Sequence, residues 1–177
     1  NGVDTSLFQP SKQKKSGEAP RPLYALVAAQ YIERKGLQYL LQAIHGLPPG
    51  VRDNMVWHLC GSGPYEGVLR SLITRYHLES SVFLDGLLTR EELANRLNNL
   101  AHLFVLPALQ EGLPLAWLEA LSAGCAVVAT RVGGIPDALT DRYDALLCDP
   151  ASPGQLAEAI SSLAADPALR EALSRRG

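Results

Sequence analysis

The chain has 177 residues, of which 47% are hydrophobic. This content supports one well-buried domain and not comfortably two. The 16 basic residues nearly balance the 18 acidic ones, which gives a formal net charge of -2. This balance gives no reason to expect nucleic acid or an anionic membrane as a partner. Partners must therefore be predicted from local motifs.

Several features of the composition favour a cytoplasmic, reducing environment. Cys60, Cys125 and Cys148 lie in apolar runs and show neither disulfide nor zinc spacing, as expected of buried free thiols. No apolar stretch approaches the length of a membrane span, and no basic-then-apolar leader is present. The four histidines show no metal-ligand spacing, so we predict no metal site.

The first segment of the chain is polar and rich in turn residues. Residues 9–22, QPSKQKKSGEAPRP, hold three prolines and a cluster of lysines without apolar periodicity, so they cannot bury enough surface to order themselves. We therefore predict that residues 1–22 are a segment entering the domain, followed by a flexible linker. Lys12, Lys14 and Lys15 could form a binding patch, although lysines in such a loop are more often simply solvated.

From residue 23 onward, short apolar runs alternate with longer amphipathic stretches, which is typical of βα units around a buried parallel sheet. The predicted strands are residues 23–29, 55–61, 81–86, 102–108, 125–130 and 145–149. Helices are predicted over residues 35–47, 65–78, 90–100 and 114–124, with two more from residue 153 on that break at Asp166-Pro167. The predicted fold class is α/β, a doubly wound parallel sheet of about six strands over residues 23–177.

In open parallel sheets ligands bind beyond the carboxyl ends of the strands, so the segments after each run form the candidate site. Gly61 and Gly63, in GSGP after the second strand, permit a tight turn and bring backbone close to a bound group. GSGP lacks the third glycine of the dinucleotide fingerprint and has no Walker lysine, so by itself it favours a structural turn. Pro64 is predicted to begin the next helix.

Arg34 and Lys35 follow the first strand and precede the first helix, so they can project over the carboxyl edge of the sheet. A diphosphate bound there would need cationic partners. The alternative is a solvated helix start. However, cations have the wrong sign for a helix amino terminus, and such local inconsistencies often mark functional positions.

The segment QEGLPLAWLEALSAG places Glu111 and Glu119 eight residues apart, around a Gly112-Leu113-Pro114 turn. Pro114 is predicted to begin a helix, which leaves Glu111 in the loop and Glu119 within the helix. Either carboxylate alone would be explained by the helix dipole. Because ionised carboxylates only accept hydrogen bonds, the pair also suits sugar and ribose hydroxyls. RVGGIP, after the fifth strand, is a further turn with two glycines.

These motifs, in this order, resemble the carboxyl-terminal domain of the group 1 glycosyltransferases (glycosyltransferase family 4, GT-B fold). The resemblance covers almost the whole chain through NGVDTSLFQP, ERKGLQYLLQAI, LCGSGP, VFLDG and EGLPLAWLEALSAGCAVVATRVGGIPD, the last of which resembles the E-x7-E motif and its continuation. It implies a Rossmann-like domain that is one half of a GT-B architecture and binds a nucleotide-diphosphate sugar. It also implies retaining transfer to a glycoconjugate or polysaccharide acceptor, with no cofactor and generally without a bound metal.

Carried over residue by residue, the resemblance assigns Arg34 and Lys35 to the diphosphate, Glu111 to the donor sugar and Glu119 to the ribose. The catalytic task is then to stabilise charge on the leaving diphosphate. Pro114 stands where many members have Gly, and it lacks an N–H, which favours the next two amides as phosphate contacts. The further donor-binding residues expected are Gly61, Gly63, Leu87, Gly112, Leu113, Leu115 and Ala116.

Two alternatives stay open, a sugar-nucleotide epimerase of the same fold and a module that binds nucleotide sugars without transferring them. The chain begins at Asn1 rather than Met and ends within a helical pattern, so it is expected to be a piece of a longer polypeptide. Without the amino-terminal acceptor domain, the isolated domain is expected to be inactive. The expected location is cytoplasmic, or peripheral at the inner membrane face through the missing domain, with no nucleic-acid partner.

Overall fold

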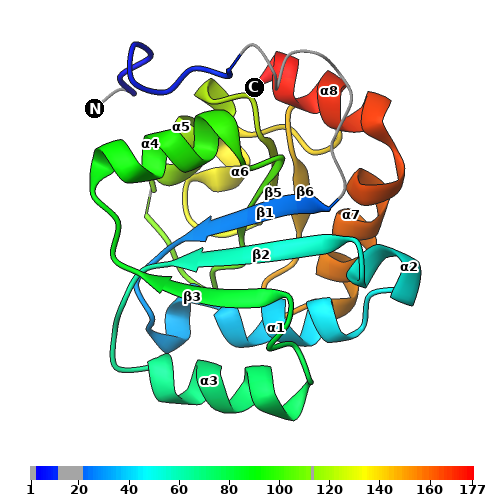
Figure 1. Cartoon of the computed structure of the whole chain (residues 1–177). Helices are drawn as coiled ribbons and strands as arrows, with labels where there is room; N and C mark the ends of the chain where they lie inside the picture. Colours follow the sequence, from blue (N-terminus) through cyan, green and yellow to red (C-terminus); the bar gives the residue numbers. More distant parts are fainter. Residues whose placement is uncertain (1–2, 12–21, 113) are drawn as a thin grey trace.

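The structure, a computed structural model, describes residues 3–11, 22–112 and 114–177, and it contains one six-stranded sheet (Figure 1). The strands are β1 (Leu23–Ala28), β2 (Met55–Cys60), β3 (Val82–Gly86), β4 (Leu103–Leu106), β5 (Ala126–Thr130) and β6 (Leu146–Cys148). They pair in parallel in the order β3-β2-β1-β4-β5-β6. The predicted α/β class and the six predicted strands are therefore confirmed.

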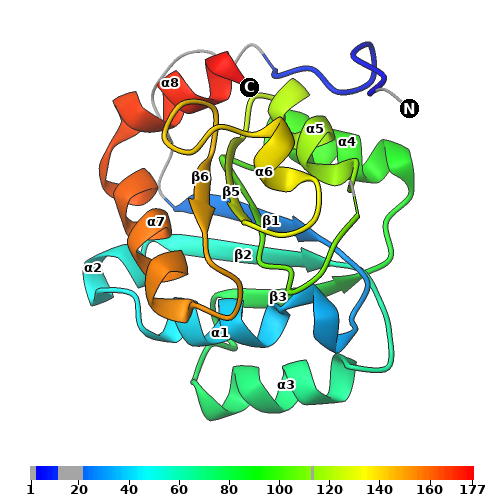
Figure 2. The same cartoon turned by 180° about the vertical axis from the view of Figure 1, so that it is seen from behind.

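Helices cover both faces of the sheet, which confirms the doubly wound arrangement. They are the 3-10 helix η2 (Glu33–Lys35), α1 (Leu37–His45), α2 (Pro49–Arg52), α3 (Glu66–Arg75), α4 (Arg90–Asn99), α5 (Ala116–Ser122), α6 (Ile135–Ala138), α7 (Pro153–Ala165) and α8 (Pro167–Arg176). Figures 1 and 2 show α1 and α3 on one side of the sheet and α4, α5 and α6 on the other. Helices as short as α2 and η2 show no apolar periodicity, and the sequence does not predict them.

Each face of the sheet has its own apolar core. One core lies against α1, α3, α7 and α8, and the other against α4, α5 and α6. β4 shows why the strands are continuous apolar runs, because Leu103 and Val105 belong to the first core while Phe104 and Leu106 belong to the second. The three cysteines are buried, as predicted. No helix in the described ranges is long and apolar enough to cross a membrane.

Two helices begin after the proline that is predicted as their first residue. α3 begins at Glu66 and α5 at Ala116, so Pro64 and Pro114 each stand two residues before the helix rather than at its first position. The fixed φ of proline suits a tight turn as well as a helix start. Pro64 stands in such a turn, and Pro114 lies outside the helix. α7 and α8 do begin at a proline, and the predicted break at Asp166 is confirmed.

The described part of the amino-terminal segment packs against α4 and α5. Phe8 is fully buried in the second core. The side-chain oxygen of Asn98 accepts a hydrogen bond from the backbone N–H of Gln9 at 2.8 Å, and its amide donates to the carbonyl of Leu7 at 2.8 Å. The prediction of a linker that cannot order itself is therefore wrong for residues 9–11. The remaining linker residues, with Lys12, Lys14 and Lys15, lie outside the described residues.

We expect Asn98→Ala to destabilise the fold by about 1–3 kcal/mol, because it removes both side-chain hydrogen bonds to this segment. The free energy of unfolding in urea would measure the loss. Asn99→Ala is the matched control, since among the described residues the Asn99 amide bonds only to Asn95 on the same helix. Equal losses for the two variants would contradict this account of the segment.

Candidate functional site

The loops at the carboxyl ends of the strands are joined to one another by backbone hydrogen bonds. The bonds run from Gly61 N–H to Gly86 O at 2.7 Å, from Tyr31 N–H to Ser62 O at 2.8 Å, from Leu109 N–H to Arg34 O at 2.8 Å and from Gly134 N–H to Gly112 O at 3.0 Å. The loops after β1 to β5 therefore form one continuous edge. β1 and β4 are neighbours at its centre, which is the switch point of the strand order, where open sheets of this kind bind ligands.

The predicted glycines of the β2 loop are required by close packing. A Cβ on Gly61 would lie 1.9 Å from the carbonyl oxygen of Ala29, and one on Gly63 would lie 2.4 Å from that of Tyr31. The buried Tyr31 hydroxyl donates to the carbonyl of Leu59 at 2.6 Å, and burial raises its pKa well above the ordinary value, so it stays a donor. The two glycines thus hold the β2 loop against the β1 loop, in agreement with a structural turn.

Lys35 and Glu111 form an ion pair across the switch point. The ammonium of Lys35, at the end of η2, contacts Glu111 Oε1 in the loop after β4. The two side chains are 15% and 9% exposed, respectively, and the residues are 76 positions apart in the sequence. The structure therefore brings together the cation predicted for the diphosphate and the carboxylate predicted for the sugar. The neighbouring Arg34 is exposed, and its side chain makes no ion pair with any described residue.

The loop after β5 holds the backbone of Glu111 in place. Gly133 has a left-handed φ of 55°, and a Cβ there would lie 2.1 Å from the carbonyl oxygen of Glu111. Only glycine combines this φ with so close an approach. RVGGIP is therefore a turn, as predicted, and it packs against the backbone of the loop that carries Glu111. By contrast, a Cβ on Gly112 would meet no atom of the described residues within 4 Å, so contacts with them do not explain that glycine.

Glu119 lies within α5, as predicted, and its side chain is 14% exposed. Burial raises its pKa, while the nearby Arg90 lowers it. Arg90 Nη2 lies 3.6 Å from Glu119 Oε1, and Arg90 is the first residue of α4. Arg90 is absent from the predicted motifs, although the same signal used for Arg34 and Lys35, a cation at a helix start, marks it in the sequence.

The other predicted donor-binding residues lie along this edge or outside the described residues. Leu87, directly after β3, is 75% exposed, and Leu115, directly before α5, is 40% exposed. α5 begins at Ala116 without a side-chain cap from the described residues. Leu113 lies outside the described residues. Within the described ranges, no group of three or more His, Cys, Asp or Glu side chains is placed to hold a metal ion.

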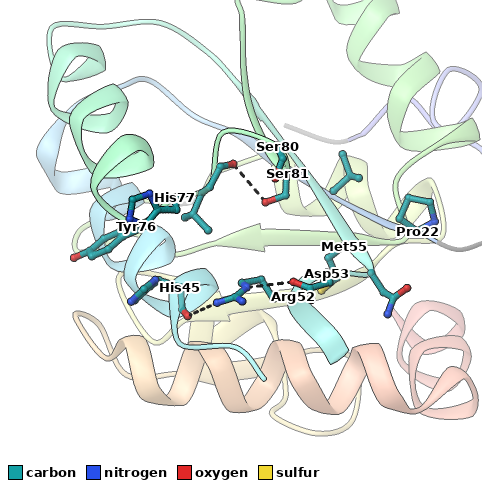
Figure 3. A pocket seen from close by; sticks show the side chains of 12 residues that line it. Pro22, His45, Arg52, Asp53, Met55, Tyr76, His77, Ser80 and Ser81 are labelled. Carbon is teal, nitrogen blue, oxygen red and sulfur yellow. Dashed lines mark hydrogen bonds and ion pairs between the residues drawn. The ribbon is translucent and has the colours of Figure 1, made fainter. Parts of the chain in front are cut away.

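A pocket of about 700 Å³ lies at the opposite edge of the sheet, where the strands begin (Figure 3). It is lined by the ends of α1 and α3, by α2 and by the starts of β2 and β3. The rings of His45 and Tyr76 stack there with centroids 4.8 Å apart. Because α1 and α3 both end at this pocket, their dipoles account for cations there and disfavour a bound anion. The pocket is therefore separate from the predicted site.

The family described as "Glycosyl transferases group 1" matches residues 8–177. The MMP alpha-(1->4)-mannosyltransferase of Mycolicibacterium hassiacum is 32% identical over 169 residues, which cover 94% of this chain and 39% of that protein. The chain spans between 30% and 39% of the length of this relative and of three other curated ones.

Two solved structures have the same fold. The C-terminal domain of the glycosyl transferase group 1 family protein LpcC from Francisella tularensis has a TM-score of 0.83 at 22% identity, covering 99% of this chain and 94% of that one. Anabaena HepE in complex with UDP-glucose has a TM-score of 0.86 at 21% identity, covering 99% and 50%. At these identities the likeness shows the fold. The chain belongs to the group 1 glycosyltransferases, with the Rossmann-like fold of a GT-B glycosyltransferase domain.

Proposed function

We propose that this chain is the donor-binding domain of a retaining glycosyltransferase that uses a nucleotide-diphosphate sugar. The acceptor is a glycoconjugate or polysaccharide, held by an amino-terminal domain, and the reaction takes place in the cytoplasm or at the inner membrane face. The observation that carries this proposal is the Lys35–Glu111 pair at the switch point, with a cation for phosphate beside a carboxylate for hydroxyls. The epimerase alternative has no comparable observation in its favour.

In the proposed reaction, the bond between sugar C1 and the β-phosphate oxygen breaks, and its electron pair stays on the phosphate. The acceptor oxygen forms a bond to C1 on the same face of the sugar, and the acceptor proton passes to the departing diphosphate. Arg34 and Lys35 stabilise the negative charge that develops on the diphosphate. The N–H groups of Leu115 and Ala116 add hydrogen bonds at the start of α5.

The two carboxylates have different tasks in this proposal. Glu111 accepts hydrogen bonds from the donor sugar, while Glu119 accepts them from the ribose. Lys35 contacts Glu111 directly, so donor binding has to place both groups on the ligand at once. Backbone near Leu87 contacts the base. The chain alone binds donor without transferring sugar, because a cleft that excludes water needs both domains.

Calorimetric titration against UDP-, GDP-, ADP- and dTDP-sugars tests the donor class. For the nucleotide that binds, Glu119→Ala should weaken nucleoside diphosphate and nucleotide sugar alike, by about 1.5–3 kcal/mol, because both carry the ribose. Glu111→Ala should spare the nucleoside diphosphate and, in the full-length enzyme, lower the rate of transfer.

Gln at each position separates charge from shape, and Glu158→Ala, an exposed position on α7, is the control. If both carboxylates only complement a helix dipole, their removal will lower the melting temperature slightly and leave affinity and transfer unchanged. That result would refute the proposed roles of both residues.

A further inference from the structure

Arg90 connects the amino-terminal segment to the E-x7-E motif. Its guanidinium carbon lies 5.6 Å from the centroid of the buried Phe8 ring, in a cation–π contact. The same guanidinium lies 3.6 Å from the carboxylate of Glu119. One side chain therefore contacts both the segment that enters the domain and the carboxylate assigned to the ribose.

The start of α4 is otherwise arranged as a helix amino terminus should be. The Thr89 hydroxyl accepts from the Glu92 N–H, and the Glu92 carboxylate accepts from the Thr89 N–H, which makes a capping box. Glu91 and Glu92 place negative charge in the first turn. Arg90 opposes the helix dipole at this position, so its placement is not explained by the stability of α4.

In the described part of the structure, Arg90 is the cation that pairs with Glu119. β4 and β5, which pack against α5, have the sequences LFVL and AVVAT and carry no ionisable group. On α4, Glu92 is held in the capping box, Glu91 is exposed and Arg96 pairs with Asp85. In the amino-terminal segment, Asp4 is near enough for Arg90 to lower its pKa, although its hydrogen bonds with Ser6 lower it more.

We propose that Arg90 is a positioning residue for the donor, because its guanidinium, held over the Phe8 ring, directs the Glu119 carboxylate toward the ribose. This inference rests on the proposed function, in which Glu119 binds the ribose of a nucleotide sugar. It adds a residue outside the predicted motifs, and it links the amino-terminal segment to the proposed donor site through the contact of Phe8 with Arg90.

The sign of the pH dependence follows from the two opposing effects on Glu119. Burial raises the pKa of Glu119, and Arg90 lowers it. The ionised carboxylate accepts the ribose hydrogen bonds, so affinity falls as the pH drops through this pKa. Removing the positive charge of Arg90 raises the pKa of Glu119 further, and the loss of affinity then occurs at a higher pH.

The test compares Arg90→Met, which keeps a long apolar stem beside Phe8, with Arg90→Lys, which keeps the charge. The probe is the nucleotide sugar that binds in the donor titration, since its diphosphate diester keeps a constant charge from weakly acidic to neutral pH. Arg90→Met should weaken binding about two- to fivefold at neutral pH, as for a half-exposed ion pair, and should move the pH midpoint upward. Arg90→Lys should restore most of the affinity.

Arg175→Ala, which removes an exposed arginine paired with Glu171 on α8, should leave both the affinity and the pH midpoint unchanged.

An NMR titration of the Glu119 carboxyl carbon needs no ligand, so it tests the role of Arg90 separately from the proposed donor-binding function. If no nucleotide sugar binds but Arg90→Met still raises the pKa of Glu119, the proposed function fails and the electrostatic role of Arg90 stands. An unchanged Glu119 pKa and an unchanged pH profile in Arg90→Met would overturn the inference.

Discussion

Replacing Lys35 by alanine is expected to weaken the binding of nucleoside diphosphate about ten- to hundredfold, the equivalent of one charge-assisted hydrogen bond of about 1.5–3 kcal/mol. The binding of the nucleoside should not change, because it lacks the phosphates. Isothermal titration of the chain with both ligands measures the difference. Equal losses for nucleoside and diphosphate would remove Lys35 from the phosphate site.

Lys35 and Arg34 have different environments in the structure, although the sequence predicts the same role for both. Lys35→Ala leaves the Glu111 carboxylate, whose side chain is only 9% exposed, without its partner, so we expect a loss of about 1–3 kcal/mol in the free energy of unfolding. Arg34 is exposed, and Arg34→Ala should weaken diphosphate binding with little effect on stability. In a double-mutant cycle, Glu111→Ala added to Lys35→Ala should recover part of the lost stability.

Tyr31→Ala is expected to cost about 3–5 kcal/mol of stability, because it removes a fully buried aromatic ring. The buried ring also anchors the backbone of Tyr31, which bonds to Ser62 and to Tyr65 on either side of the turn after β2, at the edge that carries the candidate site. Diphosphate affinity should therefore fall as well, measured at a temperature where the variant is folded. Urea unfolding measures the stability.

Two variants make this expectation specific. Tyr31→Phe keeps the ring and loses only the 2.6 Å hydrogen bond to the carbonyl of Leu59, so it should cost about 1–2 kcal/mol. Tyr143→Ala removes a tyrosine that is 56% exposed and should change stability little. A loss below about 1 kcal/mol for Tyr31→Ala would contradict the role of the ring in the fold.

The sheet could be predicted from the sequence because its strands are buried on both faces. Such strands are continuous apolar runs, as Leu103–Leu106 shows, and the helices between them carry regular apolar stripes. The start of α5 could not be placed as well, since the φ of Pro114 fits both a turn and a helix. The burial of Phe8 could not be predicted either, because a single apolar residue in a polar segment has no periodicity.

The edge that carries the candidate site could be predicted from the sequence, but the pairings of its residues could not. The rule that ligands bind beyond the carboxyl ends of parallel strands gives the edge, and it predicts both Lys35 and Glu111 there. Their ion pair depends on β1 and β4 being neighbours, which follows from the strand order and not from local sequence. The contact of Arg90 with Glu119 depends likewise on how α4 packs beside α5.

The buried cysteines can report on local opening of the chain through their rates of reaction with thiol reagents. Burial raises the pKa of Cys60 to about 12 and that of Cys148 to about 11, so neither carries appreciable thiolate at neutral pH. A thiol reagent therefore reacts only when the surrounding segment opens, and its rate follows the local opening equilibrium. Cys60 ends β2 beside Gly61, whereas Cys148 ends the edge strand β6. The two labelling rates therefore report separately on opening beside the loop after β2 and on opening at β6.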